Sequence, residues 1–167
     1  MKIRSLQASD AEAYQKIRLE GLKMNPEAFG STYEREVAFS LETVRERLTP
    51  QADKFVLGVF DNQGVLMGVV IFVRDSGVKT SHKGNVFGMY VTEEMRGLGL
   101  GKALLIELIH RARTCSGLEQ INLTVVDGNT AAQKLYESLG FERYGLERRA
   151  LKVDVLYLDE VLMVMQL

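Results

Sequence analysis

The sequence predicts an α/β or α+β protein with a mixed sheet, and three observations lead to this class. Two apolar runs of strand length flank the turn-forming segment Asp61–Gly64, which is typical of a hairpin. A helical pattern separates two further strand patterns, Asn85–Thr92 and Leu118–Val126, as in a β-α-β unit. From Phe141 onward the chain returns to strand patterns, so helices interrupt one largely continuous sheet.

The first part of the chain predicts a strand, a helix, a loop and a second helix. The alternating segment "KIRSL" predicts the strand, and Ser9 with Glu12 forms the S-x-x-E pattern of a capping box that opens the first helix. Segment Met24–Ser40 has no clean period and contains proline and glycine, so we expect it to be mostly loop. Leu41–Leu48 then predicts a short helix.

The middle of the chain predicts three strands. "KFVLGVF" and "VLMGVVIFV" form the hairpin around Asp61–Gly64, and Arg74–Gly84 follows as a loop. Asn85–Thr92 is the third strand, and Gly88 within it indicates a bulge, because glycine weakens pairing inside a strand.

The last third predicts two helices and the remaining strands. The first helix has a core-facing stripe and a stop signal at Gly117; the stripe consists of Leu104, Leu105, Leu108, Ile109 and Ala112. Strand Leu118–Val126 is expected to lie parallel to Asn85–Thr92. Asn129 caps the second helix and Gly140 closes it, with Ala132, Leu135, Tyr136 and Leu139 facing inward. "FERYG", "LKVDVLYL" and "EVLMVMQL" are expected as three strands, the last paired with another copy or lying inside the sheet.

Composition bounds the kind of protein. With 167 residues, 46% hydrophobic and 26% charged, we expect one folded domain spanning 1–167. The net charge of -1 provides no overall field for nucleic acid or an anionic membrane. The longest apolar run is too short to span a bilayer, and the N-terminus shows no secretory signal. Cys115 is alone, which suits a reducing cytoplasm, and the few histidines and this cysteine lack metal-ligand spacing.

The stretch "MRGLGLGKALL", residues 95–105, places three glycines in alternation between a strand and a helix. A phosphate P-loop does not fit, because Arg96 replaces its first glycine and Ala103 its hydroxyl residue. A dinucleotide fingerprint is weak, because Lys102 stands at its third glycine. Two interpretations stay open: an anion cradle of backbone amides at a helix start, and a turn that needs positive φ.

Two motifs in this part of the chain resemble those of the GNAT superfamily of N-acetyltransferases. Arg96, Gly99 and Gly101 match its acetyl-CoA motif Q/R-x-x-G-x-G/A. "NTAAQKLYESLGFE", residues 129–142, matches the pattern N-x-x-A-x-x-L-Y-x-x-x-G-F. The resemblance is strong from about Val86 to Phe141 and weaker toward both ends.

The resemblance implies the GNAT-like acyl-CoA N-acyltransferase fold, a mixed and mostly antiparallel twisted sheet of six to seven strands with about four helices. It implies acetyl-CoA as co-substrate and no metal. Pantetheine would lie in a gap between strands Asn85–Thr92 and Leu118–Val126, and the pyrophosphate on the amides that follow. The cofactor-binding residues it implies are Met89, Tyr90, Val91, Arg96, Gly97, Leu98, Gly99, Leu100, Gly101, Lys102, Asn129 and Ala132.

Acetyl transfer to an amine requires a neutral nucleophile, stabilisation of a tetrahedral oxyanion and a proton for the departing thiolate. Tyr136 is the candidate acid, because a phenol stays protonated at neutral pH; the competing interpretation is a core tyrosine. Backbone near Tyr90 and Val91 is the expected oxyanion donor. The base is not identified, since His82 and His110 are both expected at the surface. Phe29, Tyr33 and Glu34, with Glu36 nearby, are candidates for the acceptor pocket.

The sequence therefore predicts a cytoplasmic, acetyl-CoA-dependent N-acetyltransferase acting on a primary amine of a small molecule or amino acid. A protein or peptide acetyltransferase and a non-catalytic acyl-CoA-binding module remain alternatives. The segment "ERRALK" at Glu147–Lys152 is too mixed in charge to predict a nucleic-acid partner. A homodimer is possible if the terminal strand pairs with another copy.

Overall fold

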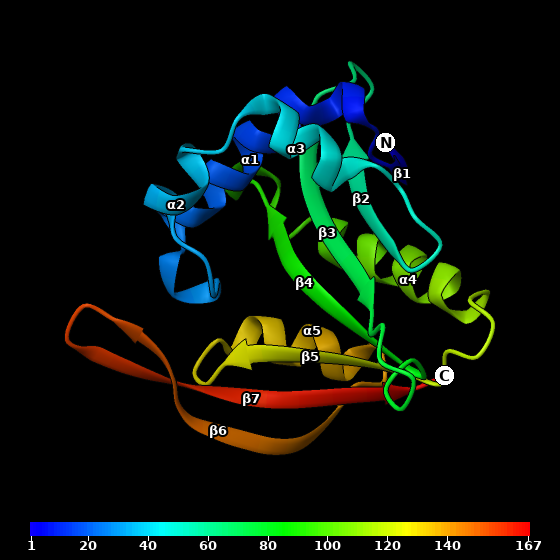
Figure 1. The fold of residues 1–167 in the computed structure, drawn as a ribbon. Coiled ribbons are helices and arrows are strands. Elements are labelled where there is room, and N and C mark those ends of the chain that lie inside the picture. Colours follow the sequence, from blue (N-terminus) through cyan, green and yellow to red (C-terminus); the bar gives the residue numbers. More distant parts are fainter.

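The computed structural model describes every residue from Met1 to Leu167 and confirms the predicted fold class. One seven-stranded sheet has the order β1-β2-β3-β4-β5-β7-β6, and every neighbouring pair is antiparallel except β4 and β5 (Figure 1). The strands are β1 Lys2–Ser5, β2 Lys54–Phe60, β3 Leu66–Arg74, β4 Lys83–Val91, β5 Gln120–Val126, β6 Glu142–Val153 and β7 Leu156–Gln166. The α-helices are α1 Ala11–Met24, α2 Tyr33–Val37, α3 Leu41–Leu48, α4 Leu100–Arg113 and α5 Thr130–Ser138. Single 3-10 turns lie at Ala8–Asp10, Pro26–Ala28 and Glu93–Met95.

Each face of the sheet has its own apolar core. The α4 stripe predicted from the sequence is buried as expected and packs on β2–β5, together with Tyr136 of α5. The other face buries α1 and α3 against β2 and β3, around Val56 and Val69. Figure 1 shows α1 and α3 on one side of these strands and α4 on the other. The predicted hairpin across Asp61–Gly64 is confirmed as well.

Strands β4 and β5 separate soon after they begin. Their parallel pairing covers only Lys83–Asn85 against Gln120–Asn122, and Figure 1 shows the two strands diverging from that point. The predicted bulge is confirmed, because Gly88 has φ +56° and the β3–β4 register shifts between Val69 and Ile71. A bulge bends its strand, so Gly88 contributes to the opening between β4 and β5.

Two predictions for the N-terminal part are wrong in detail. Ser9 does not cap the first helix. Instead the backbone N–H of Gln7 donates to Asp10 Oδ2 at 2.8 Å, and α1 begins at Ala11. Asp10 takes this place because Arg4 also donates to both of its carboxylate oxygens, which fixes the carboxylate beside the turn. The segment 24–40 is not mostly loop, because it contains a 3-10 turn and α2. A helix of five residues is too short to show a period, and a tertiary ion pair of Glu36 helps to hold it.

The C-terminal segment forms two long strands, where the sequence predicts three. "FERYG" and the start of "LKVDVLYL" belong to β6, and a turn at Asp154 with φ +53° divides the second segment. The turn at Asp154 and Val155 contains neither glycine nor proline, so the alternation of the sequence could not locate the boundary between β6 and β7. Strand β7 lies inside the sheet between β5 and β6, which resolves the open alternative for the terminal strand. A homodimer would therefore need another surface. No helix of the protein has both the length and the apolar character to cross a bilayer.

Candidate active site

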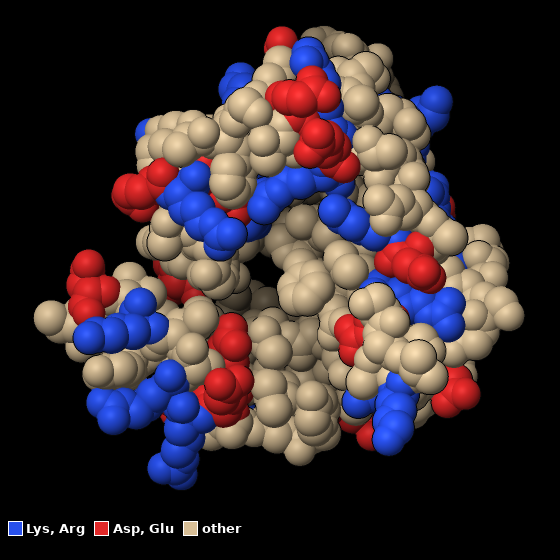
Figure 2. Space-filling model, in the orientation of Figure 1, with Lys and Arg blue, Asp and Glu red and all other residues tan.

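A cleft of about 1030 Å³ opens where β4 and β5 separate. It is walled by β4, by the glycine turn after it, by β5, by the start of α5 and by the segment from α1 to Ser31. Figure 2 shows the hollow in the middle of this face of the molecule. The predicted site residues that line it are Met89, Tyr90, Val91, Arg96, Gly97, Gly99, Leu100, Gly101, Lys102, Asn129, Ala132, Tyr136 and Phe29. The structure therefore brings together residues that are more than 100 positions apart, such as Phe29 and Tyr136.

Three predicted site residues lie outside the lining. Leu98 is 62% exposed on the outer side of the glycine turn. Tyr33 lies on α2, where the Lys23 ammonium is 4.3 Å from its ring centroid, and Glu34 is exposed on the same helix. Phe29 is thus the residue of the predicted acceptor group that reaches the cleft.

The glycine turn presents a row of unused hydrogen-bond donors. The backbone N–H groups of residues 97–102 donate to no acceptor within the chain, and α4 begins inside this row. The first N–H groups of any helix lack internal partners, and the helix dipole favours an anion there. Unpaired donors cost free energy unless water or a ligand satisfies them. An anionic group such as a phosphate is the kind of ligand that satisfies donors at a helix start.

Conformation explains two of the three glycines. Gly97 and Gly99 have φ of +76° and +79°, and a Cβ on either would meet no atom within 4 Å. They are glycines because of the positive φ, as the turn interpretation requires. Gly101 lies in α4 without positive φ, and a Cβ there would be 2.7 Å from Met89 Cε. The turn and the cradle are therefore compatible, since the left-handed residues leave the amides unpaired beside the cleft.

Arg96 and Asn129 both have structural partners. Arg96 Nε donates to the Val91 carbonyl at 3.1 Å, and Nη2 donates to Asn25 Oδ1 at 2.7 Å. Its charge thus joins the end of β4 to the turn after α1. The Asn129 side chain accepts from the Ala132 amide at 3.2 Å, so the predicted N-cap is confirmed.

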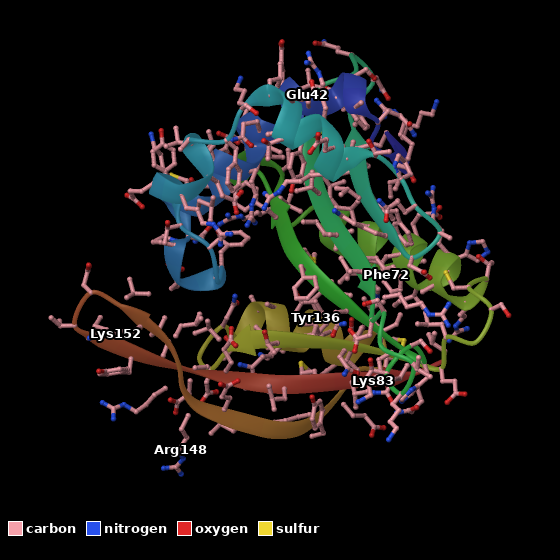
Figure 3. The ribbon with its side chains drawn as sticks, viewed as in Figure 1. Glu42, Phe72, Lys83, Tyr136, Arg148 and Lys152 are labelled. Atoms are coloured by element: carbon pink, nitrogen blue, oxygen red, sulfur yellow. The ribbon has the colours of Figure 1, made fainter.

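The side chain of Tyr136 extends from α5 toward β4 (Figure 3), and its hydroxyl is 3.7 Å from Met89 Sδ. Its ring is 8% exposed and meets Phe141 edge-on at 5.9 Å between centroids. Burial without a charged partner raises the pKa of Tyr136 to about 12. It is at once a core residue and a phenol that lines the cleft, so the two interpretations of this tyrosine do not exclude each other.

Glu160 on β7 is a carboxylate of the cleft that the sequence did not single out. Val161, Met163 and Met165 are buried on the α5 side of β7, so alternation places Glu160 on the opposite side. Burial and the charge of Glu147, its cross-strand partner, raise the pKa of Glu160, and a hydrogen bond with Thr124 lowers it in part. A carboxylate with a raised pKa is the kind of group that general bases require.

Tyr90 and Arg18 are two further side chains at this site with defined partners. The Tyr90 hydroxyl donates to Glu20 Oε1 at 2.9 Å, and burial together with this carboxylate raises the pKa of Tyr90 to about 12. Arg18 of α1 lines the cleft and pairs with Glu36 of α2. The neighbouring position Ile17 is part of the core face of α1, and nothing in the helix pattern distinguishes Arg18 from a surface arginine. No group of three or more His, Cys, Asp or Glu side chains could hold a metal ion.

Comparisons with known proteins define the class. The "Acetyltransferase (GNAT) family" model matches residues 20–141. The chain therefore belongs to this family, in agreement with the resemblance inferred from its motifs.

Particular relatives are similar over most of this chain. A mycothiol acetyltransferase from Thermobispora bispora is 33% identical over 140 residues, which is 81% of this chain and 44% of the relative. A mycothiol acetyltransferase from Thermomonospora curvata is 34% identical over 137 residues, 81% of this chain and 42% of the relative. The chain thus spans less than half the length of these curated relatives.

Solved structures share the fold. A GNAT family acetyltransferase from Streptococcus pneumoniae has a TM-score of 0.89 at 24% identity, with 99% of this chain and 98% of that chain covered. A phosphinothricin acetyltransferase from Sinorhizobium meliloti, solved in complex with acetyl-CoA, has a TM-score of 0.80 at 24% identity. Coverage there is 99% of this chain and 88% of that one.

Proposed function

We propose that this protein transfers an acetyl group from acetyl-CoA to the primary amine of a small-molecule or amino-acid acceptor. The observation that carries the proposal is the row of six unpaired N–H groups, residues 97–102, at the mouth of the β4–β5 opening. Family membership and the acetyl-CoA complex of the Sinorhizobium meliloti structure support the choice of cofactor. The chain matches less than half the length of the mycothiol acetyltransferases, so their name does not identify the acceptor of this protein.

Acetyl-CoA supplies an activated thioester, and the residues of the chain do the rest. The amides of 97–102 hold the pyrophosphate, assisted by the exposed Lys102. Met89 and Val91 present strand backbone to pantetheine on the side of β4 that β5 has left. The Val91 carbonyl already accepts a hydrogen bond from Arg96. The backbone group that Val91 offers to the thioester oxygen is therefore its N–H.

Proton transfer is divided between the two sides of the opening. Glu160 accepts the proton of the amine, and its raised pKa makes it a stronger base than an ordinary carboxylate. Tyr136 donates a hydrogen bond to the departing sulfur from the α5 side. With a pKa of about 12, it is a weaker proton donor than a free phenol, so we assign it stabilisation of the thiolate rather than complete transfer.

The proposal is tested with a panel of amines, amino acids and a peptide with a free N-terminus, each given acetyl-CoA while thiol release is followed. Acetylation of small amines in preference to the peptide is the expected result. Release confined to the peptide would favour the protein or peptide alternative. Acetyl-CoA binding by calorimetry without turnover on any acceptor would leave the non-catalytic module as the better description.

Replacing Gly99 with Ala is expected to weaken acetyl-CoA binding by about 10-fold, because a residue at φ +79° must shift and carry the adjacent amides with it. Gly64→Ala is the matched control, since Gly64 has φ +84°, equally open surroundings and a place in the hairpin turn outside the lining of the cleft. Both changes should lower stability by about 1–2 kcal/mol. Calorimetric titration should separate them, and equal affinities in the two variants would contradict the cradle.

Replacing Tyr136 with Phe is expected to reduce kcat by about 10- to 100-fold while acetyl-CoA affinity stays near that of the native protein. The phenyl ring keeps the contact with Phe141, so the core around α5 is preserved. Single-turnover kinetics with a reactive amine provide the measurement. An unchanged rate at every pH would show that Tyr136 is a core residue only.

A further inference from the structure

The Arg18 guanidinium is fixed by Glu36 and has one nitrogen left over. Nε donates to Glu36 Oε2 at 2.9 Å, and Nη2 donates to Oε1 at 2.8 Å. The pair is buried, with side chains 11% and 2% exposed. Nη1 is buried as well and has no hydrogen-bond partner, the one such side-chain atom in the protein. A buried charged donor without an acceptor is costly, so its persistence needs a reason.

This nitrogen lies at the wall of the cleft where β4 bulges. A Cβ added to Gly88 would be 3.3 Å from Arg18 Nη1, and both residues line the cleft. The guanidinium also lies over the Phe29 ring, 4.9 Å from its centroid, which limits its movement on the other side. Nη1 therefore presents a charged donor close to the strand that, in the proposed function, holds the thioester.

A lysine could neutralise Glu36 equally well. Arginine differs because its planar fork binds a carboxylate with two nitrogens and keeps a further nitrogen for a second acceptor. The residue type at position 18 thus suits a group that joins Glu36 to an additional oxygen ligand.

The surroundings of Arg18 are basic. A second hollow of about 280 Å³ shares Arg18, Ser31 and Phe87 with the cleft. Arg18, Arg35, Arg47 and Lys54 line it, against one carboxylate, Glu36. Figure 2 shows Lys and Arg side chains along the upper margin of the central hollow and acidic side chains below it. An anion at Arg18 would be attracted from this side, and an amine from the side of Glu160.

We propose that the acceptor is zwitterionic: it carries an oxyanion, of the carboxylate type, that binds Arg18 Nη1 while its amine faces Glu160. This rests on the proposed function and names the acceptor class that the α1 wall selects. An acceptor of this kind satisfies the orphaned donor and turns the charge separation across the cleft into orientation of the amine.

The test compares each acid with its own amide as acetyl acceptor: leucine with leucinamide, glutamate with its α-amide, and γ-aminobutyrate with its amide. Aminoethylphosphonate against ethanolamine forms a separate arm that distinguishes phosphonate from carboxylate. We expect kcat/KM to favour at least one acid over its amide by about 10- to 100-fold, the range of a charge-assisted hydrogen bond. A preference confined to the phosphonate arm would overturn the carboxylate assignment.

Arg18→Lys is the principal variant, because it keeps a cation beside Glu36 and removes Nη1. The preference for the acid should disappear, with KM rising far more than kcat falls. If that variant does not fold, the double variant R18M/E36Q, which leaves no buried charge, takes its place. Arg111→Lys is the matched control: Arg111 is a half-buried, ion-paired arginine on α4, outside the lining of both hollows, and its replacement should keep the preference.

Two failures are distinguishable. If the native protein binds acetyl-CoA and acetylates amides as fast as acids, or if Arg18→Lys keeps the preference, the inference is wrong and the proposed function stands. If no acetyl-CoA binding is measured by calorimetry, the proposed function itself fails.

Discussion

Replacing Glu160 with Gln is expected to reduce kcat/KM for amine acetylation by about 10²- to 10⁴-fold, the usual contribution of a general base. The amide has nearly the shape of the carboxylate and keeps an oxygen acceptor near Thr124, so the cleft should remain intact. Glu142→Gln is the matched control, since Glu142 is an exposed carboxylate at the start of β6, outside the cleft. A loss of less than about threefold in Glu160→Gln would remove Glu160 from the reaction.

The pH profile provides an independent test of the same residue. A base acts in its deprotonated form, and burial with the charge of Glu147 raises the pKa of Glu160. The rate should therefore fall with decreasing pH at a higher pH than an ordinary carboxylate would require. Glu147→Gln removes the repulsion across the β6–β7 pair and should move this acidic limb toward lower pH. An unmoved limb would show that another group titrates.

Replacing Glu160 with Gln should raise the stability of the protein while it lowers the activity. Because the folded-state pKa of Glu160 is raised, its contribution is most favourable below the unfolded-state pKa and is lost as pH rises through the folded-state pKa. Glu160→Gln should consequently have a higher Tm than the native protein at neutral pH, with the difference vanishing in acid. A base at a site of this kind reduces stability, and that trade is common in active sites.

Most residues predicted to bind the cofactor line the cleft, whereas of the predicted acceptor residues only Phe29 does. The glycine turn and the segment from Asn129 to Tyr136 are continuous stretches, so spacing along the chain identifies them, and the structure places them on one cleft. Glu160 and Arg18 are single charged residues within regular elements. In β7 and α1 such residues usually face solvent, and only the tertiary structure shows that these two face a cleft.

The fold shows the same division. Long periodic segments such as α4 and the β2–β3 hairpin could be predicted because burial of one face imposes the period. The five-residue α2 and the turn at Asp154 could not, since they depend on contacts or on strained φ rather than on a pattern. The segment "ERRALK", whose mixed charge does not predict a nucleic-acid partner, lies within β6, and Figure 3 shows Arg148 and Lys152 on the β6–β7 hairpin, away from the opening between β4 and β5.

Replacing Glu36 with Ala is expected to lower the free energy of unfolding by about 3–5 kcal/mol, since it leaves the Arg18 charge buried and unpaired. For a chain of this length the Tm should fall by roughly 10 °C or more. Glu42→Ala is the matched control, because Glu42 forms an exposed pair with Arg45 at 3.4 Å on α3 and should change stability by less than about 1 kcal/mol. Thermal melts of the two variants side by side provide the comparison.

The pH dependence of this loss has a definite sign. Burial raises the pKa of Glu36. The hydrogen bond and charge of Arg18, together with the charge of the nearby Arg47, lower it by more, so the net shift of the pKa is downward. The carboxylate therefore stabilises the fold above its unfolded-state pKa, and this contribution disappears as pH falls through the folded-state pKa. The difference between the native protein and Glu36→Ala should shrink in acid. A constant difference across that range would mean that lost packing, rather than charge, accounts for the effect.

The double variant Arg18→Met with Glu36→Met separates pairing from burial. Removing both charges leaves two apolar side chains of similar length between α1 and α2, so most of the stability lost in Glu36→Ala should return. Acceptor selection should not return with it, because Met offers no donor at the Gly88 bulge. Stability and selection would then be two separate consequences of the same guanidinium: Nε and Nη2 hold α2 against α1, and Nη1 lies buried beside Gly88 at the wall of the cleft. If acid preference recovered together with stability, the two roles could not be separated in this way.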